Sequence, residues 1–198
     1  MKEKTNDKNR VGKAVVKNMR ILTMLLILVL AMAAPVNAKG GTRFLTATRI
    51  TKTVLDKLGL ENIDKVMIVA HPDDEMLWGG MHLIQDDYLV VCLTNANTRR
   101  YGKTRMREFK KVMEQTNDIG LMLNYPDYSS TGGIDNWTSC SKRIQEDLNT
   151  LLTYKNWKEV VTHNKQGEYG HKHHKKTHRF VTKAFKKAGL SGATLKYF

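Results

Sequence analysis

The sequence has no apolar run long enough to cross a bilayer, which takes about 20 residues. Its longest apolar run, Ile21 to Ala34, is shorter, follows a basic segment and precedes the small residues Val36 and Ala38. This order is typical of a secretory signal peptide cleaved after Ala38, with an uncleaved anchor as the alternative. We therefore predict that residues 1–38 are a leader, that residues 39–198 form one domain, and that the protein is exported to the cell envelope or beyond it.

Cysteine is scarce, since the chain has only two. In an exported protein Cys92 and Cys140 are candidates for a disulfide. However, Cys92 lies inside "YLVVCLT", a run that predicts a buried strand, and a buried free thiol behaves as a small apolar side chain. We therefore favour two free thiols over a disulfide.

Acidic residues are outnumbered, 19 against 33 basic ones, for a formal net charge of +14. Residues 1–38 contain seven basic and two acidic side chains, so the rest of the chain carries +9. This excess favours anionic partners such as envelope polymers, lipid headgroups or acidic glycans. Aromatic residues make up only 8% and do not alternate with the basic ones. No nucleic-acid partner is therefore expected.

Short apolar runs rich in β-branched residues predict strands buried on both faces of a parallel sheet. Between them, apolar residues at a spacing of three and four predict helices, and Gly189 stands where a helix commonly ends. Strands that alternate with helices indicate an α/β fold, a mostly parallel sheet flanked by helices in a single domain. The predicted strands are 65–70, 88–94, 159–163 and 193–198, and the predicted helices are 105–119, 136–153 and 173–188.

Two clusters of potential metal ligands follow predicted strands. His71 to Glu75 crowds a histidine and three acids directly after the first strand, and five of the seven histidines lie between His163 and His178. Both clusters should lie at the carboxyl edge of the sheet, where ligands of α/β proteins bind. A catalytic zinc site takes three nitrogen or oxygen ligands and keeps one position open. A solvated histidine tract is the alternative for the second cluster.

The ordered segments "AHPDDE", "WGG", "LTN", "TRMREF" and "THNKQGEYGHKHHKKTH" resemble the LmbE-like / PIG-L family of zinc-dependent N-acetylglucosaminyl deacetylases. The resemblance implies a Rossmann-like fold. It also implies a metal-dependent hydrolase that removes the acetyl group from an N-acetylated amino sugar in a glycan, glycolipid or glycoside. That substrate could belong to an anionic envelope polymer or lipid. Zn²⁺ is the expected cofactor, with another divalent ion such as Fe²⁺ as the alternative.

The same resemblance implies a role for individual residues. His71, Asp74 and His174 match the metal ligands of the family, and Asp73 matches its general base. His171 matches the histidine that steadies the oxyanion or protonates the leaving amine. This chemistry suits the residue types, because a carboxylate that binds no metal can accept a proton from water.

The second cluster departs from the family's usual His-Pro-Asp-His, since Lys172 replaces the proline and His173 replaces the aspartate. A histidine cannot supply the negative charge that would orient His171 and raise its pKa. The domain is also C-terminally short for the family. These departures favour an alternative function: a catalytically weakened carbohydrate- or polyanion-binding protein of the same fold. His178, one helical turn after His174, is interpreted as a supporting residue.

Two further residues are candidates for substrate binding. Arg105 lies on a predicted helix with Glu108, so a helix-surface ion pair and a contact to a sugar hydroxyl or phosphate are both open. His163 ends a predicted strand at the active edge and is expected to line the pocket. The polar loop 124–133 is a candidate sugar platform or an ordinary connection.

Overall fold

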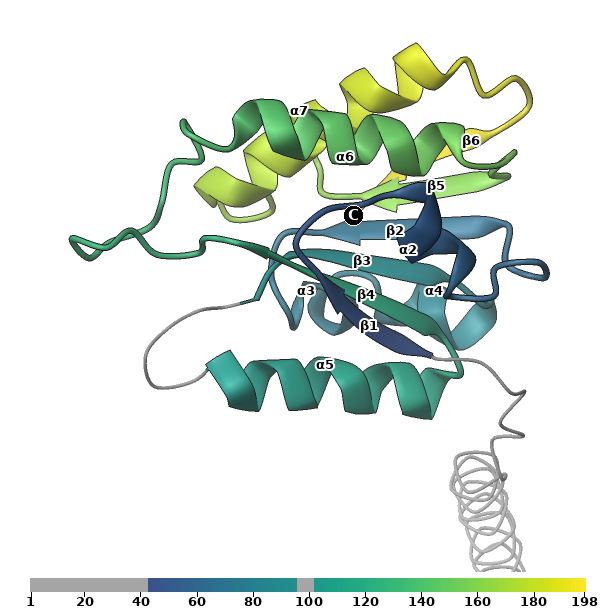
Figure 1. Ribbon diagram of the computed structural model, residues 1–198, viewed down its shortest axis with the longest axis horizontal. Coiled ribbons are helices and arrows are strands. Elements are labelled where there is room, and N and C mark those ends of the chain that lie inside the picture. The colour runs from purple at the N-terminus through teal and green to yellow at the C-terminus, as the bar shows by residue number, and fades with distance from the viewer. Residues whose placement is uncertain (1–42, 96–101) are drawn as a thin grey trace, which may run out of the picture. The chain divides into compact units, whose positions relative to one another are not determined.

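The computed structural model describes residues 43–95 and 102–198, so the predicted leader lies outside the described residues. The chain there forms one six-stranded sheet with the order β1-β4-β3-β2-β5-β6, and every neighbouring pair is parallel (Figure 1). The predicted α/β fold with a parallel sheet is therefore confirmed. The elements run β1 (Phe44–Ala47), α2 (Lys52–Asp56), β2 (Lys65–Val69), α3 (Asp74–Leu77), α4 (Gly80–Gln85), β3 (Leu89–Thr94), α5 (Gly102–Thr116), β4 (Ile119–Tyr125), α6 (Ser141–Thr153), β5 (Glu159–Thr162), α7 (Lys172–Ala188) and β6 (Thr194–Tyr197).

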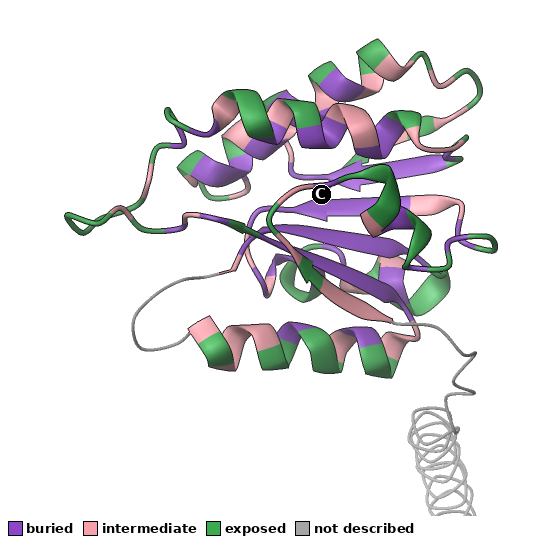
Figure 2. Cartoon of the chain, viewed as in Figure 1, coloured by how far each residue is buried: buried purple, intermediate pink, exposed green. Residues whose placement is uncertain are grey.

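Each face of the sheet has its own apolar core, because successive side chains of a strand point to opposite faces. In β2, Val66 and Ile68 join the cluster under α6 and α7, whereas Met67 and Val69 join the cluster under α4 and α5. The helices thus cover both faces, with α6 and α7 on one side and α5 on the other (Figure 1). Figure 2 shows the central strands buried along their length. This double cover explains why the strands have continuous apolar runs instead of alternating ones.

The sequence-based prediction of a helix through Ile119 was wrong. The helix α5 ends at Thr116, and Asn117 adopts a φ of 65°. The Asp118 carboxylate then accepts a hydrogen bond from the Tyr88 N–H at 2.6 Å, and Ile119 N–H bonds to Tyr88 O at 3.0 Å. These contacts place the next seven residues in the sheet as β4, a strand that local periodicity did not indicate.

Other local expectations hold. Gly189 ends α7 in the left-handed conformation, with φ of 60°. Cys92 and Cys140 are both buried free thiols, which confirms that interpretation. In contrast, α6 begins at Ser141 and not at 136, because Trp137 has a φ of 53° that a helix does not accommodate.

The strand order places a switch point at the carboxyl end of β2. From β2 the chain moves to β3 and β4 on one side, and it returns to β5 and β6 on the other. Ligands of open α/β sheets bind in the crevice that opens at such a point. The segments after β2 and β5, which carry the two predicted ligand clusters, meet there. Within the described residues, no helix is long and apolar enough to span a bilayer.

Candidate active site

The turn after β2 holds two adjacent carboxylates apart. Asp73 adopts a φ of 138°, which is unfavourable for residues other than glycine. Its N–H donates a hydrogen bond to the Glu75 carboxylate at 2.9 Å. The His71 N–H donates to Asp74 Oδ2 at 2.8 Å. Asp74 is thereby buried, whereas a third of the Asp73 side chain stays exposed. Backbone strain of this kind persists where the surrounding structure fixes it, often at functional sites.

The three predicted metal ligands form a compact triangle. His71 Nδ1 lies 3.2 Å from Asp74 Oδ2, and His174 Nε2 lies 3.2 Å from both Asp74 Oδ1 and His71 Nδ1. A tetrahedral zinc ion with ligands at about 2.0–2.2 Å has ligand atoms about 3.3–3.6 Å apart. The residues present therefore fit a divalent cation, although His71 and His174 are separated by 103 positions in the sequence.

Hydrogen bonds aim the unprotonated ring nitrogens at this triangle. Because His174 Nδ1 contacts Glu168 Oε2 at 2.6 Å and a carboxylate only accepts, Nδ1 carries the proton and Nε2 is free. His173 Nε2 must donate to Asp135 O at 2.5 Å. His173 Nδ1 therefore accepts from His71 Nε2 at 3.0 Å, so His71 Nδ1 is the nitrogen that faces the triangle and would exchange its proton for a cation. These tautomers follow from the partners of each ring.

The electrostatics of the cluster suit a positive charge. Burial disfavours the charged form of His71, but hydrogen bonds with Asp127 and Asp74 outweigh it and raise the pKa of His71 to about 9. Burial also opposes ionisation of Asp74. The neighbouring rings of His163, His174 and His71 outweigh that effect and hold the pKa of Asp74 well below its usual value. The site thus keeps the buried carboxylate of Asp74 anionic and favours a proton on His71 beside it. A place that a cation would occupy is expected to behave in this way.

Asp73 faces a different partner. Its Oδ2 forms an ion pair with Arg105 Nη1 at 2.7 Å, and Arg105 also reaches Pro72 O at 3.3 Å. Burial and the neighbouring charge of Asp74 raise the pKa of Asp73 despite the opposing effect of Arg105. A carboxylate that is half-exposed, oriented and of raised pKa suits a general base. For Arg105 the sequence left open an ion pair on the helix surface and a contact to the substrate. The structure adds a third role, in which Arg105 orients Asp73.

Comparisons with known proteins identify the family of the chain. Residues 66–185 match the PIG-L family, described as GlcNAc-PI de-N-acetylase. The chain belongs to the PIG-L family. It is 36% identical over 125 residues to an uncharacterized protein, L374, of Acanthamoeba polyphaga mimivirus. The match covers 57% of this chain and 53% of that protein, so the chain spans about half the length of the curated relative that it matches.

A solved structure is also similar to part of the chain. It is an N,N'-diacetylchitobiose deacetylase from Pyrococcus horikoshii, complexed with an inhibitor. The TM-score is 0.49 at 18% identity, and the match covers 63% of this chain and 50% of the other.

His171 lies at the mouth of the site. It lines an open cleft of about 300 Å³ together with Asp73, Asp74 and Arg105, and its ring centre is 4.7 Å from those of His71 and His174. Burial, together with the charges of the neighbouring histidines, lowers the pKa of His171 to about 4. In this PIG-L chain the side chain of His173 does not form the hydrogen bond that would orient the ring of His171. The ring of His173 contacts His71 instead, and only its backbone N–H donates to His171 Nδ1.

His163 is buried and is not among the residues that line the cleft. Its side chain is fully buried, its Nε2 accepts from the Ala70 N–H at 3.0 Å, and its Nδ1 contacts Glu168 at 2.9 Å. Its ring stacks on His174 at 4.0 Å. His163 therefore packs against the metal ligand His174 on the side away from the cleft. A side chain at the carboxyl end of a central strand can point into the packed interior as well as into the crevice, and that of His163 points into the interior.

Sequence reasoning missed the aromatic rim of the cleft. Trp78, Tyr128 and Tyr169 all line it, and all are exposed. The rings of Trp78 and Tyr169 lie 6.2 Å apart. Tyr128 comes from the polar loop 124–133 that was singled out as a candidate platform. Exposed aromatic faces beside polar groups suit a ligand with both apolar and hydroxyl-bearing surfaces.

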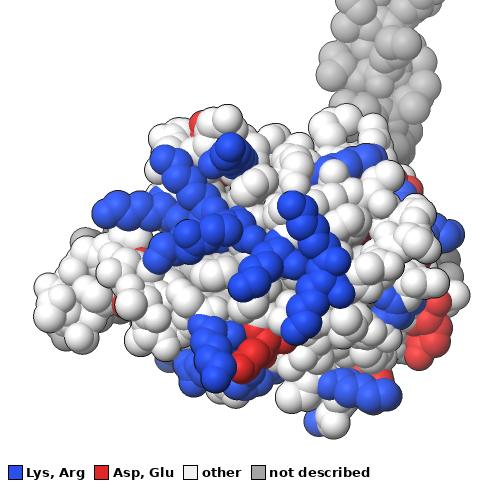
Figure 3. Space-filling view, turned by 90° about the horizontal axis from the view of Figure 1, so that it is seen from above, with Lys and Arg blue, Asp and Glu red and all other residues white. Residues whose placement is uncertain are grey.

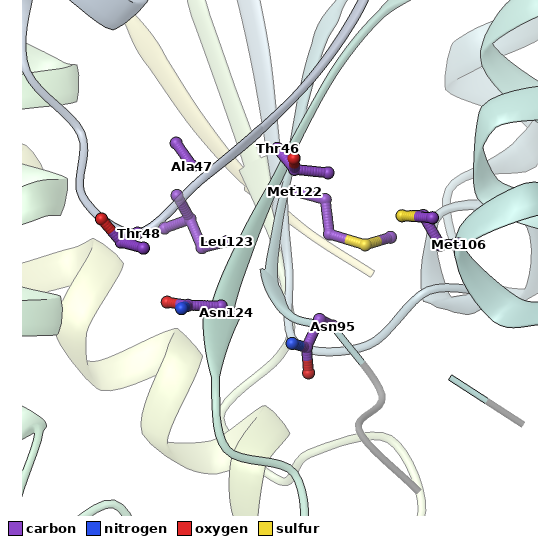
Figure 4. Close-up of a pocket in the computed structure, with 8 residues that line it drawn as sticks. All are labelled: Thr46, Ala47, Thr48, Asn95, Met106, Met122, Leu123 and Asn124. Carbon is purple, nitrogen blue, oxygen red and sulfur yellow. The ribbon is translucent and has the colours of Figure 1, made fainter. Parts of the chain in front are cut away.

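A second pocket opens at the carboxyl ends of β1, β3 and β4 (Figure 4). It measures about 350 Å³, and its described lining carries hydroxyl, amide and apolar side chains without acid, histidine or basic groups. The described lining of this pocket therefore has no imidazole or carboxylate that could act as a general base, unlike the cleft beside β2. The lining is Thr46, Ala47, Thr48, Asn95, Met106, Met122, Leu123 and Asn124.

Glu168 is a second residue that sequence reasoning missed, although it stands in "GEYGH". Its carboxylate contacts both His174 and His163. We expect Glu168→Gln to lower the affinity for Zn²⁺ by about 10–100-fold, as for other residues that orient a metal ligand. Titration of the metal-free protein against a chelating indicator measures this directly. Glu146→Gln, which removes a carboxylate paired with Arg49 near the surface, serves as control and should keep the wild-type affinity.

Proposed function

We propose that this chain is a metal-dependent hydrolase that removes the acetyl group from an N-acetylated amino sugar. The single observation that carries the proposal is the triangle of His71, Asp74 and His174 at 3.2 Å, with the Asp73 carboxylate beside it at the wall of the cleft. Membership of the PIG-L family, described by a deacetylase activity, supports the reaction type, and the aromatic rim supports a sugar as the substrate.

The chain's own residues would divide the work as follows. A divalent ion held by His71, Asp74 and His174 supplies Lewis acidity at the acyl carbonyl. Asp73, oriented by Arg105, takes a proton from water, and the oxygen of that water forms a bond to the carbonyl carbon. The carbon–nitrogen bond then breaks, and the nitrogen takes up the proton. The products are acetate and the free amine. His171 lies where it can donate a hydrogen bond to the oxyanion, in its neutral form given its lowered pKa.

Metal analysis combined with acetate release tests the proposal. The purified protein should hold about one divalent ion per chain. It should release acetate and free amine in equal amounts from at least one of N-acetylglucosamine, N,N'-diacetylchitobiose, a simple N-acetylglucosaminide and N-acetylglucosaminyl phosphatidylinositol. A protein that binds no divalent ion and releases no acetate from any of them contradicts the proposal.

One observation favours the alternative, a carbohydrate-binding protein with weakened catalysis. No carboxylate among the described residues forms an ion pair with His171, and its pKa is lowered and not raised. A protein that holds its metal ion and binds these sugars, yet releases no acetate, is the result expected from this alternative. Replacing His173 with aspartate should then be the first variant tested for restored acetate release.

A further inference from the structure

A groove lined by basic side chains runs along the outer face of α7. It measures about 490 Å³ and is lined by Lys165, Lys175, His178, Arg179, Thr182, Lys183 and Lys186. The helical members recur every three or four positions, so they share one face of the helix. From Lys175 to Lys186 this face extends about 16 Å at the helical rise per residue. The groove can thus hold a chain of linked groups and not only a single ion.

The cations of the groove are not neutralised by acidic residues in the described part of the chain. In the part of the chain that the structure describes, no ion pair joins Lys175, Arg179 or Lys183 to a carboxylate, and no acidic residue lines the groove. This differs from the basic residues elsewhere that pair with acids, such as Lys158 with Asp64. Figure 3 shows Lys and Arg side chains gathered on the face that α6 and α7 form, with few acidic ones among them. Such a surface attracts a polyanion.

The groove adjoins the cleft of the candidate active site through a short glycine-containing loop. Lys175 lines the groove and packs over Gly167, where an added methyl group would lie 2.8 Å from Lys175 Cγ. At Gly170 an added methyl group would lie 3.8 Å from Lys175 Nζ. The residues on either side of Gly170, Tyr169 and His171, line the cleft. A molecule that leaves the cleft over this loop therefore reaches Lys175 first.

The lining fits a glycan better than a membrane or a nucleic acid. Hydroxyl groups stand beside the cations, since Thr182 Oγ1 lies 3.2 Å from the Tyr197 hydroxyl, and the exposed Tyr197 ring packs on His178 at 4.7 Å. The groove is concave and its lining has no apolar side chain that would enter a bilayer. It also lacks the row of aromatic rings on which successive bases stack.

We propose that the groove along α7 binds the acidic sugars of a polyanionic glycan whose N-acetylated amino sugar occupies the cleft. The inference rests on the proposed function for the identity of the sugar in the cleft. The cations of the groove then select acidic chains over neutral ones and hold the next sugars along the chain.

A binding experiment tests the groove independently of catalysis. The probes are an octasaccharide of alternating N-acetylglucosamine and glucuronic acid, and the neutral N-acetylglucosamine oligomer of the same length. The full chain should bind the acidic probe at least about tenfold more tightly at low salt, and this preference should shrink as NaCl is raised, because salt screens exposed charges. Arg179→Glu/Lys183→Glu should abolish the preference.

A matched variant controls for net charge. Arg107 and Lys111 are also an exposed arginine and lysine one turn apart, but on α5 at the other face of the sheet. Arg107→Glu/Lys111→Glu changes the net charge equally and should keep the preference for the acidic probe. Equal loss in both double variants, or equal affinity of the wild type for both probes, contradicts the groove. Tighter binding of a DNA oligonucleotide or of anionic lipid vesicles than of the acidic glycan also contradicts it.

Acetate release separates this inference from the proposed function. If the wild type binds the acidic probe through α7 but releases no acetate, the groove stands and the deacetylase proposal fails. If it deacetylates the neutral oligomer as efficiently as the acidic one, the deacetylase stands and the groove fails.

Discussion

Replacing Asp73 with asparagine is expected to lower the rate of acetate release by at least about a hundredfold while leaving the bound metal ion in place. The reason is that a general base contributes about 10²–10⁴ to a hydrolysis rate, and an amide accepts no proton at neutral pH. Asn suits this position, because it has nearly the shape of Asp and adds no backbone strain to what Asp73 already carries at a φ of 138°. Steady-state acetate release and metal analysis of the same preparation measure both halves of the expectation.

Asp64→Asn provides a matched control. Asp64 is also an aspartate in an ion pair with a basic residue, Lys158, and its side chain is exposed to a similar extent, 36% against 33% for Asp73. It should keep the wild-type rate. Near-normal acetate release by the Asp73 variant would show that another group takes the proton, and His171 and Glu75 would be the next candidates.

Replacing His174 with alanine is expected to lower the affinity for Zn²⁺ by at least about a hundredfold and to abolish acetate release. His174 supplies one of three converging ligand atoms, and its loss should cost more than the loss of a residue that merely orients a ligand. Metal content after dialysis against a weak chelator measures the effect. Because His174 is fully buried, thermal unfolding must show that the variant folds. His71→Ala, in the turn after β2 and not in α7, should give the same loss if His174→Ala is unstable.

His178→Ala serves as the control in the same helix. His178 lies one turn further along α7, and its Nδ1 contacts the His163 carbonyl at 2.9 Å and not the ligand triangle. It should retain its metal ion. Full metal occupancy in His174→Ala would refute the assignment. It would point to His171, one of whose ring nitrogens lies within 4.8 Å of a ring nitrogen of His71 and one of His174.

Local signals in the sequence determined much of the fold. Continuous apolar runs predicted β2, β3 and β5, since a strand covered on both faces has no polar side. The run 193–198 predicted β6, but this edge strand is mostly exposed and not buried on both faces. The spacing of apolar residues together with Gly189 predicted α7 nearly to its ends. The same patterns placed one ligand cluster after β2 and the other after β5. In a parallel sheet the carboxyl ends of neighbouring strands meet at one edge, so the convergence of the two clusters followed from the sequence once the strands were placed.

Contacts between distant segments were decided only by the tertiary structure. The position of β4 depends on the hydrogen bonds that Tyr88 forms with Asp118 and Ile119, and the local spacing of apolar residues does not predict them. The pairing of Arg105 with Asp73 and of Glu168 with His174 depends on which rotamers the packed loops leave open. Local periodicity reports which face of an element is buried, but it does not report which polar atoms meet across the sheet.

His173 shows this limit most clearly. The sequence shows that a histidine stands where the family usually has an aspartate, so His171 lacks a negatively charged partner at this position. This conclusion depends only on the residue type. The structure adds that the ring of His173 turns to His71, 102 positions away, and stacks on Trp137 at 4.0 Å. Whether a histidine serves one neighbour or another is set by the packing around its ring, since both of its nitrogens need a partner once they are buried. The sequence by itself determined the ligand types and their edge of the sheet, and the packed structure decided which ring nitrogen faces the metal site.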